Sequence, residues 1–304
     1  MLTFEKPTIQ NRPLWEQYLT YSRHKGCEYN FVNLYLWGRQ KAAVVEDFLV
    51  FFSQFDQKSV YLYPSGQGNI TPAIQAILDH AKRRDIPCRI TGLLAQDCET
   101  LENAFPGKFQ FHCDRSGFDY VYRTEDLATL KGRKFQKKRN HLNRFRQEYP
   151  NHRFEPITKE NCAQVLAFCD AWFDARLKAD PYQDFILEQA ALKKALTHFE
   201  QLGLHGLALY NGEELLAITI GSILAEDTMD VHFEKAMLPQ DGVYAAINQG
   251  FASYVLETLP HITFLNREDD MGLPGLRQAK LSYTPDHMVE KYWAKALEDT
   301  NEDE

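Results

Sequence analysis

The hydrophobic pattern falls into two stretches of the chain. In each stretch, alternating and helical spacings occur together and predict a mixture of strands and helices. In the first stretch, short apolar runs predict strands at 42–46, 48–53, 60–63, 88–91 and 118–122. Apolar residues at helical spacing predict helices at 13–23, at 95–104 and directly after Thr71-Pro72. This pattern is typical of a strand-rich α/β domain, which we expect to end near residue 128.

The second stretch follows Pro150 and starts with two expected helices, at 159–179 and 183–202. Asn211-Gly212 is a strong hairpin signal between two of the strands that follow. These strands are expected at 206–210, 215–224 and 229–234. A helix at 243–259, a strand at 262–266, a short helix through GLRQAKL and a last strand at 288–292 complete this stretch. The tail from Glu298 has five carboxylates and no basic residue, so we expect it to be disordered.

A basic segment, Lys131 to Arg146, lies between the two stretches and carries eight Lys or Arg residues without a carboxylate. Phe135, Leu142 and Phe145 recur at helical intervals and predict a helix with one apolar face. Such a helix could present its cations to the phosphates of RNA or of an anionic membrane. The expected polyanion-binding residues are Lys134, Lys137, Lys138, Arg139 and Arg144. The alternative is a solvated helix that only links two domains.

Composition narrows the class of protein further. The chain has 304 residues, of which 44% are hydrophobic and 25% charged, and its net charge is −8. These values are those of a globular protein with room for two domains. The N-terminus has no apolar signal-peptide core, so we expect a cytoplasmic protein, with peripheral contact to the membrane as an option. The six cysteines form no CxxC pair and the ten histidines no HExxH motif, so we expect no metal.

Several sequence runs resemble one known family. The order of elements after Pro150 is that of the GNAT acyltransferase domain. The runs KGRKFQKKRNHLNRF, NREDDMGLPGLRQAKLSYTP, FVNLYLWGR and DGVYAAINQGFASYV resemble uncharacterised bacterial proteins related to the C-terminal domain of phosphatidylglycerol lysyltransferases. The resemblance implies an α/β fold of two tandem GNAT-like domains joined by the basic helix. The expected boundaries are 1–129 for the first domain, 130–150 for the helix, 151–297 for the second domain and 298–304 for the tail.

The resemblance also implies a reaction. The lysyltransferases take an aminoacyl group from aminoacyl-tRNA and pass it to a lipid, and related enzymes pass it to an amine; neither needs a cofactor. Acetyl-CoA enzymes carry a glycine-rich R/QxxGxG/A loop, whereas this chain has LPQDGVYAA at 238–246, with one glycine and an aspartate. We therefore expect an aminoacyl transferase. An acyl-CoA-dependent N-acyltransferase and a non-catalytic RNA- or membrane-binding protein are the alternatives.

The acidic triplet Glu268-Asp269-Asp270, directly after the strand that ends at Asn266, is the first candidate for the site. Three adjacent carboxylates repel one another, which suits the binding of an ammonium group or the retention of one carboxylate as a general base. We expect Asp269 and Asp270 to be catalytic, and Glu268 and Asn266 to bind substrate. The alternative is a loop that caps the following helix.

Three further residues complete the expected site. Arg277 and Lys280 lie three apart on the short helix and could bind a phosphate or an oxyanion, or simply pair with the acidic triplet. Glu234 ends a strand at the gap where GNAT folds hold the acyl group, and is a third catalytic candidate; the alternative is a surface carboxylate. His232 and Phe233 alternate on the same strand, and the pattern leaves open which of them faces inward.

Overall fold

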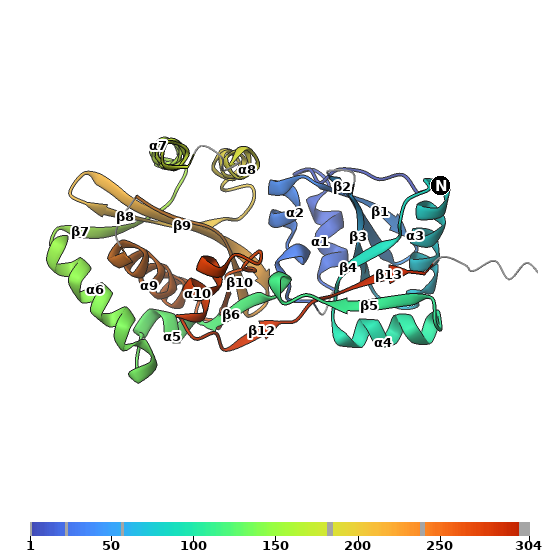
Figure 1. Cartoon of the computed structure of the whole chain (residues 1–304). Helices are drawn as coiled ribbons and strands as arrows, with labels where there is room; N and C mark the ends of the chain where they lie inside the picture. Colours follow the sequence, from blue (N-terminus) through green and yellow to red (C-terminus); the bar gives the residue numbers. More distant parts are fainter. Residues whose placement is uncertain (1, 22–23, 56–57, 181–184, 238–240, 298–304) are drawn as a thin grey trace, which may run out of the picture. The chain divides into compact units, whose positions relative to one another are not determined.

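The chain folds into two compact units, each built around one β-sheet (Figure 1). The computed structural model describes residues 2–21, 24–55, 58–180, 185–237 and 241–297. The first unit contains the chain up to Phe118 and the segment from Val289 onward. The second unit runs from Asp119 to Met288. Among the described helices, none is long and apolar enough to cross a membrane.

The first unit has a six-stranded sheet with the strand order β1-β2-β3-β4-β13-β5. Its strands are β1 (Gln40–Val45), β2 (Phe48–Phe55), β3 (Lys58–Gly66), β4 (Arg89–Leu93), β5 (Phe109–Cys113) and β13 (Tyr292–Ala296). Its helices are α1 (Arg12–Leu19), α2 (Phe31–Trp37), α3 (Thr71–Arg83) and α4 (Ala95–Ala104), with short 3-10 turns at Cys27–Tyr29 and Arg115–Gly117.

Successive side chains of β2 are buried on opposite faces of this sheet, where helices cover them. Phe51 meets Trp15 of α1 edge to face, with 5.8 Å between ring centroids. Its neighbour Phe52 points the other way and packs against Tyr61 and against His80 of α3. Because successive side chains of a strand point to opposite faces, a run of apolar residues such as FLVFF fits a strand covered on both sides.

The second unit has a seven-stranded sheet with the strand order β12-β6-β11-β10-β9-β8-β7. Its strands are β6 (Asp119–Arg123), β7 (His152–Pro156), β8 (His205–Asn211), β9 (Glu214–Ala225), β10 (Thr228–Ala236), β11 (Phe264–Asn266) and β12 (His287–Val289). Its helices are α5 (Thr124–Thr129), α6 (Gln136–Glu148), α7 (Cys162–Ala179), α8 (Ile186–Thr197), α9 (Asp241–Thr258) and α10 (Pro274–Leu281), and a 3-10 turn at Arg133–Phe135 leads into α6.

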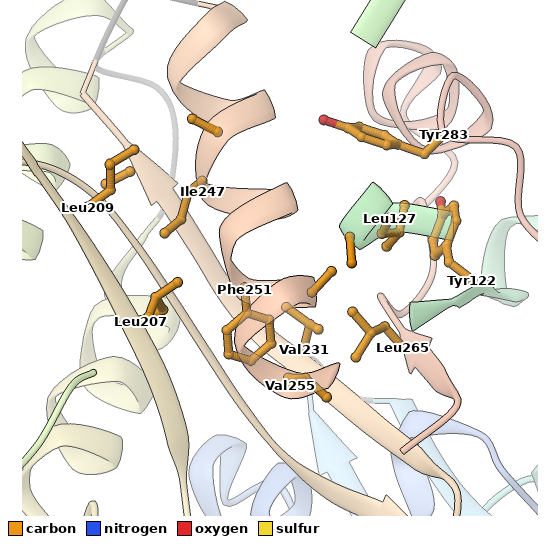
Figure 2. Close-up of a cluster of buried hydrophobic side chains, with 14 of the residues drawn as sticks. Tyr122, Leu127, Leu207, Leu209, Val231, Ile247, Phe251, Val255, Leu265 and Tyr283 are labelled. Atoms are coloured by element: carbon orange, nitrogen blue, oxygen red, sulfur yellow. The ribbon is translucent and has the colours of Figure 1, made fainter. Parts of the chain in front are cut away.

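The core of the second unit lies between α9 and one face of this sheet, with α7 and α8 on the other face (Figure 1). Figure 2 shows Ile247, Phe251 and Val255 of α9 directed at Leu207 and Val231 of the strands. α9 is apolar on most of its surface because α5 and α6 also pack against it. A helix that is buried on several sides needs no polar face.

Each unit contains a parallel strand–helix–strand segment whose two strands pair only briefly. In the first unit, β3 and β4 flank α3 and pair at Tyr61 with Ile90 and at Leu62 with Thr91. In the second, β10 and β11 flank α9 and pair over three residues, from Thr228 with Phe264 to Asp230 with Asn266. The described residues beyond these pairs form no further ladder between the two strands, so the sheet is open at the end of each short parallel ladder.

The domain boundaries expected from the sequence differ from those of the two units. β6 and α5, expected in the first domain, belong to the second unit, where β6 pairs with β11. The last strand, expected at 288–292 in the second domain, is in fact two: β12 ends at Val289 in the second sheet, and β13 starts at Tyr292 and lies between β4 and β5 of the first unit. The sequence also gave no expectation for β5. The local pattern identifies a strand, but the partner is chosen by backbone hydrogen bonds to residues far along the chain.

The basic helix is likewise part of the second unit rather than a connection between two domains. Phe135, Leu142 and Phe145 are buried in the same cluster as α9, as the apolar spacing predicts. Gly242, near the start of α9, lies against this helix, where an added Cβ would be 3.1 Å from Cβ of Phe145. The packing of two helices therefore explains the one glycine of the LPQDGVYAA run. Residues 238–240 of that run, and the expected disordered tail 298–304, lie outside the described residues.

Candidate functional site

The divergence of β10 and β11 creates the candidate site of the second unit. β10 continues to Ala236 after its last pair with β11, at Asp230. An irregularity between Val231 and Phe233 interrupts the pairing of β10 with β9. A bulge of this kind bends a strand and shifts its side-chain alternation. It brings both His232 and Phe233 inward, with only 1% of the His232 side chain exposed, which answers the question that the sequence left open.

Glu234 and Arg267 form a buried ion pair beside this divergence. Nη2 of Arg267 donates to Oε1 of Glu234 at 3.0 Å, and each side chain is 14% exposed. Nδ2 of Asn248, from α9, donates to the other carboxylate oxygen at 3.3 Å. The aromatic rings of Tyr122 and Tyr283, both labelled in Figure 2, lie 5.7 and 5.2 Å from the Arg267 guanidinium. The pair is thus held by residues of β6 and α9 and by Tyr283, which follows α10.

Arg267 retains one hydrogen-bond donor that the described part of the protein does not use. Its Nη1 is buried and has no hydrogen-bond partner among the described residues. An unsatisfied buried N–H is costly, and such groups commonly mark a place where a ligand atom binds. A guanidinium in a partly dry gap can stabilise a negative charge that develops on a bound oxygen.

Asp270 occupies a different position, at the centre of a saturated network. Arg277 donates to both of its oxygens, at 2.8 and 3.0 Å. The Tyr120 hydroxyl donates to Oδ2 at 2.5 Å, and the Gly272 amide donates to Oδ1 at 2.9 Å. The hydrogen bond from Arg277 is the main cause that holds the pKa of Asp270 well below its ordinary value, against the opposing effect of burial. A carboxylate so strongly ionised is a poor general base, so the structure does not support that role for Asp270.

The other members of the acidic triplet shape the same loop. Oδ1 of Asp269 accepts from the Met271 amide at 3.0 Å, which closes a turn. Glu268 adopts a positive φ of 58° and extends its side chain toward His232. Asn266 is fully buried; it bonds Asp119 at 2.9 Å and accepts from the Glu268 amide at 2.7 Å. Of the triplet, only Asp269 and Glu268 keep a partly exposed side chain.

Arg277 and Lys280 lie close to the triplet, as expected, but both are engaged. Arg277 is 37% exposed and chelates Asp270. Lys280 is 8% exposed and donates to the carbonyl oxygens of Arg267 and Glu268. Burial, followed by the nearby Arg267 charge, lowers the pKa of Lys280. These contacts favour the alternative in which both cations pair with the loop and hold its shape.

The cations of α6 and of the residues just before it, from Lys131 on, divide into those with a partner in the unit and those exposed to solvent. Lys134 pairs with Asp126 at 2.8 Å and Arg144 with Glu148 at 2.7 Å. Arg139 binds the carbonyl oxygens of Leu130 and Gly132, and Nζ of Lys138 lies 3.7 Å above the Tyr283 ring. Lys137 is exposed, as are Lys131, Arg133 and Arg146 outside the expected set. The exposed cations at both ends of the helix therefore form the surface that a polyanion can reach.

The sequence reasoning missed three residues of this region and named a fourth, His232, without giving it a role. Arg267, Asn248, Tyr120 and His232 all take part in the networks around the divergence of β10 and β11. Arg267 directly follows a short strand and directly precedes the acidic triplet, and this position could have marked it as a candidate site residue. Tyr120 and Asn248 reach the region from distant parts of the chain and had no local signal.

These features define a class of protein. A sheet that opens between two parallel strands, with a helix between them in sequence and polar groups at the opening, is the arrangement of GNAT-type acyltransferases. A tandem GNAT protein from the clavulanic acid biosynthesis pathway shares this fold, with a TM-score of 0.50 at 9% identity over 98% of this chain and 99% of its own. The protein is accordingly a tandem GNAT-like α/β protein.

The chain belongs to the family described as "Phosphatidylglycerol lysyltransferase, C-terminal", which matches residues 19–295. The solved structure of a conserved protein of unknown function from Bacteroides thetaiotaomicron is similar, with 35% sequence identity and a TM-score of 0.91. The match covers 98% of this chain and 100% of that protein's chain. L-PGS from Bacillus licheniformis has a TM-score of 0.69 at 17% identity, over 96% of this chain and 93% of its own. In a curated, uncharacterised relative that is 28% identical over 189 residues, the match spans 57% of that protein's length. Family and fold together indicate an acyltransferase-type activity.

Proposed function

We propose that this protein transfers an aminoacyl group from aminoacyl-tRNA to the hydroxyl of a lipid or to an amine, by direct attack of the acceptor on the tRNA ester. The family match supports a donor of this kind. The single observation that carries the proposal is the buried Arg267–Glu234 pair at the opening of the sheet, with Nη1 of Arg267 lacking a described partner.

Each partner of this pair has a defined part in the reaction. The acceptor oxygen or nitrogen forms a bond to the ester carbonyl carbon, and the bond from that carbon to the tRNA ribose oxygen breaks. Nη1 of Arg267 stabilises the negative charge on the carbonyl oxygen as the tetrahedral intermediate forms. The carboxylate of Glu234 takes the acceptor's proton, which then passes to the departing ribose oxygen. Ester transfer by this route needs positioning, a base and an oxyanion partner.

Two further parts of the unit support a nucleic-acid donor. The exposed cations of α6 can bind phosphates of the tRNA. The same helix packs against the start of α9, which is where a GNAT enzyme would receive the pyrophosphate of CoA. The alternative donor, an acyl-CoA, has weaker support because packing explains the glycine of this segment.

The experiment measures movement of label from charged tRNA. Total tRNA charged with labelled amino acids is incubated with the protein and with either phosphatidylglycerol vesicles or a soluble amine. Label in the organic extract, or on the amine, identifies the acceptor. Arg267→Lys keeps the charge but loses the free guanidinium donor, and we expect about 10²–10³-fold slower transfer. Arg123→Lys is the matched control, since Arg123 forms a surface ion pair with Asp286 and is 59% exposed.

Two results would overturn the proposal. In the first, tRNA binds but neither acceptor gains label and the ester is not cleaved faster, which favours a non-catalytic binding protein. In the second, acetyl-CoA raises the melting temperature in a saturable way while charged tRNA has no effect, which favours an acyl-CoA enzyme.

A further inference from the structure

A second buried cluster lies on the face of β10 that points away from α9. Met229 and Val231 belong to the α9 side of the core, so the alternation of the strand turns Asp230 to the opposite face. There, Nδ1 of His232 lies 3.6 Å from Oδ2 of Asp230 and 3.6 Å from Oε1 of Glu268. One ligand atom of each residue lies within 4.8 Å of the others. One imidazole and two carboxylates thus converge on a small volume.

The His232 ring is fixed in a way that leaves Nδ1 directed at this volume. Its Nε2 lies 2.8 Å from Oγ of Ser222, the residue that pairs with Asp230 across the sheet. The serine oxygen can accept the Nε2 proton, and in that tautomer Nδ1 carries a lone pair. Nδ1 is buried and has no hydrogen-bond partner among the described residues. Histidine ligands of metals are commonly held in this way by a hydrogen bond at the other ring nitrogen.

The arrangement suits a cation between the three groups. The Nδ1 lone pair points at two carboxylate oxygens in a region where the imidazole is 1% and the Asp230 side chain 0% exposed, and a cation bound by all three would offset the cost of their burial. Metal–ligand bonds of 2.0–2.2 Å at tetrahedral angles place the donor atoms about 3.4 Å apart. The two distances of 3.6 Å are close to that value.

We propose that Asp230, His232 and Glu268 bind a divalent transition metal of the Zn²⁺ type, with Nδ1 of His232 as the nitrogen ligand. Three protein ligands leave one position of a tetrahedral ion open. Glu268 is 25% exposed, so the ion can enter and exchange from its side. No spacing motif in the sequence points to this site, because two of its ligands lie on β10 and the third follows β11.

The bound ion would also act on the loop that carries Arg267. Glu268 follows Arg267 directly, so a metal that ties Glu268 to β10 restrains the loop next to the opening of the sheet. The metal site does not rest on the proposed transfer, because its ligands and its test are independent of any tRNA or acceptor.

The test uses Co²⁺ as a spectroscopic probe on the full chain. The protein is stripped with a chelator, titrated with Co²⁺ and then challenged with Zn²⁺. We expect the visible bands of four-coordinate Co²⁺ to saturate at one ion per chain and to disappear as Zn²⁺ displaces it. His232→Gln and Glu268→Gln should each remove the bands, while Ser222→Ala should weaken binding by about 10- to 100-fold. His261→Gln, at an exposed histidine, is the matched control and should bind as the unaltered chain does.

Circular dichroism and the melting temperature report whether each variant folds. Glu268→Gln is the decisive variant if His232→Gln fails to fold, since the Glu268 side chain is partly exposed and glutamine keeps its shape. Absence of Co²⁺ and Zn²⁺ binding by the unaltered chain would overturn the proposal. So would binding that survives Glu268→Gln, or an NMR spectrum that shows a proton on Nδ1 of His232 in the presence of metal.

Discussion

Asp270 and Arg267 are both charged and lie within one loop, but their hydrogen bonding indicates different roles, one structural and one suited to a ligand. Each oxygen of Asp270 accepts hydrogen bonds from neighbours of the same unit, so the residue has no capacity left for a substrate. Arg267 has one donor satisfied by Glu234 and one without a described partner. The first pattern stabilises a fold, and the second is what a site for a ligand requires.

A substitution at Asp270 should therefore change stability. We expect Asp270→Asn to lower the free energy of unfolding by about 2–3 kcal/mol, because the buried charge-assisted bonds to Arg277 and Tyr120 are lost or weakened. Asp269→Asn is the matched control: the asparagine oxygen can still accept from the Met271 amide, so the change should stay within about 0.5 kcal/mol. Urea unfolding at neutral pH measures both values.

The difference between wild type and Asp270→Asn should depend on pH in a fixed direction. The folded-state pKa of Asp270 is depressed, chiefly by the hydrogen bond from Arg277. Its contribution to stability is therefore complete above about pH 4, near the ordinary aspartate pKa, and is lost as the pH falls toward the depressed value. The two proteins should converge in stability below about pH 4. Equal unfolding midpoints at neutral pH would instead show that Asp270 carries no stabilising charge.

At the scale of one element, α6 combines a structural face with a charged one. Phe135, Leu142 and Phe145 anchor it to the core, and Lys138 covers the Tyr283 ring on the way to the surface. The sequence analysis groups Lys137 and Lys138 together among the expected polyanion-binding residues. The structure separates them, since Lys138 contacts an aromatic side chain of the core and Lys137 is exposed.

This separation predicts different results for two neighbouring substitutions. If Lys137 meets a phosphate, Lys137→Gln should reduce the slope of log affinity for tRNA against log salt by about 0.7–0.9, with the melting temperature unchanged. Lys138→Gln should instead cost about 0.5–1 kcal/mol of stability through the lost cation–π contact. Lys82→Gln, at an exposed lysine of α3 in the other unit, is the control. Fluorescence anisotropy over a salt series checks the slopes, and identical slopes for all three variants would exclude Lys137 from the tRNA surface.

At the scale of the whole molecule, the first unit is assembled from both ends of the chain, whereas the second unit is one continuous segment. The first unit obtains β13 from the end of the chain, and β13 pairs on both sides, with β4 and with β5. Residues up to Phe118 therefore do not contain the complete sheet of their unit. Trp293 of β13 also stacks on His112 of β5, with 4.1 Å between ring centroids.

A truncation tests this dependence. A chain that ends at Met288 lacks a central strand of the first sheet, so the backbone groups of β4 and β5 that pair with β13 lose their partners. We expect hydrogen exchange to become fast in β4 and β5 while α9 and β8–β10 remain protected. The control chain ends at Leu297 and keeps β13. Unchanged protection in β4 and β5 would show that the first sheet forms without its last strand.

The sequence by itself determined the elements that depend on local periodicity. The helix α4 has the bounds 95–104 that its pattern predicts, the Asn211-Gly212 hairpin joins β8 to β9, and the apolar face of α6 is buried. Helical spacing and turn chemistry act within a few residues, so one sequence suffices to show them. The family resemblance, which those elements and runs carried, is confirmed over residues 19–295.

Only the tertiary structure decided the partners of these elements and the roles of their polar residues. The local pattern of β6 and β13 is that of an ordinary strand and does not indicate a partner. Hydrogen bonds to residues far along the chain assign each strand to its sheet. The run Arg267 to Asp270 is one charged stretch in sequence, yet Tyr120 and Arg277 saturate Asp270 while Glu268 lies beside His232. The physical reason is common to both cases: a pKa, an ion pair and a strand register depend on groups brought together from distant positions, and local spacing carries no information about them.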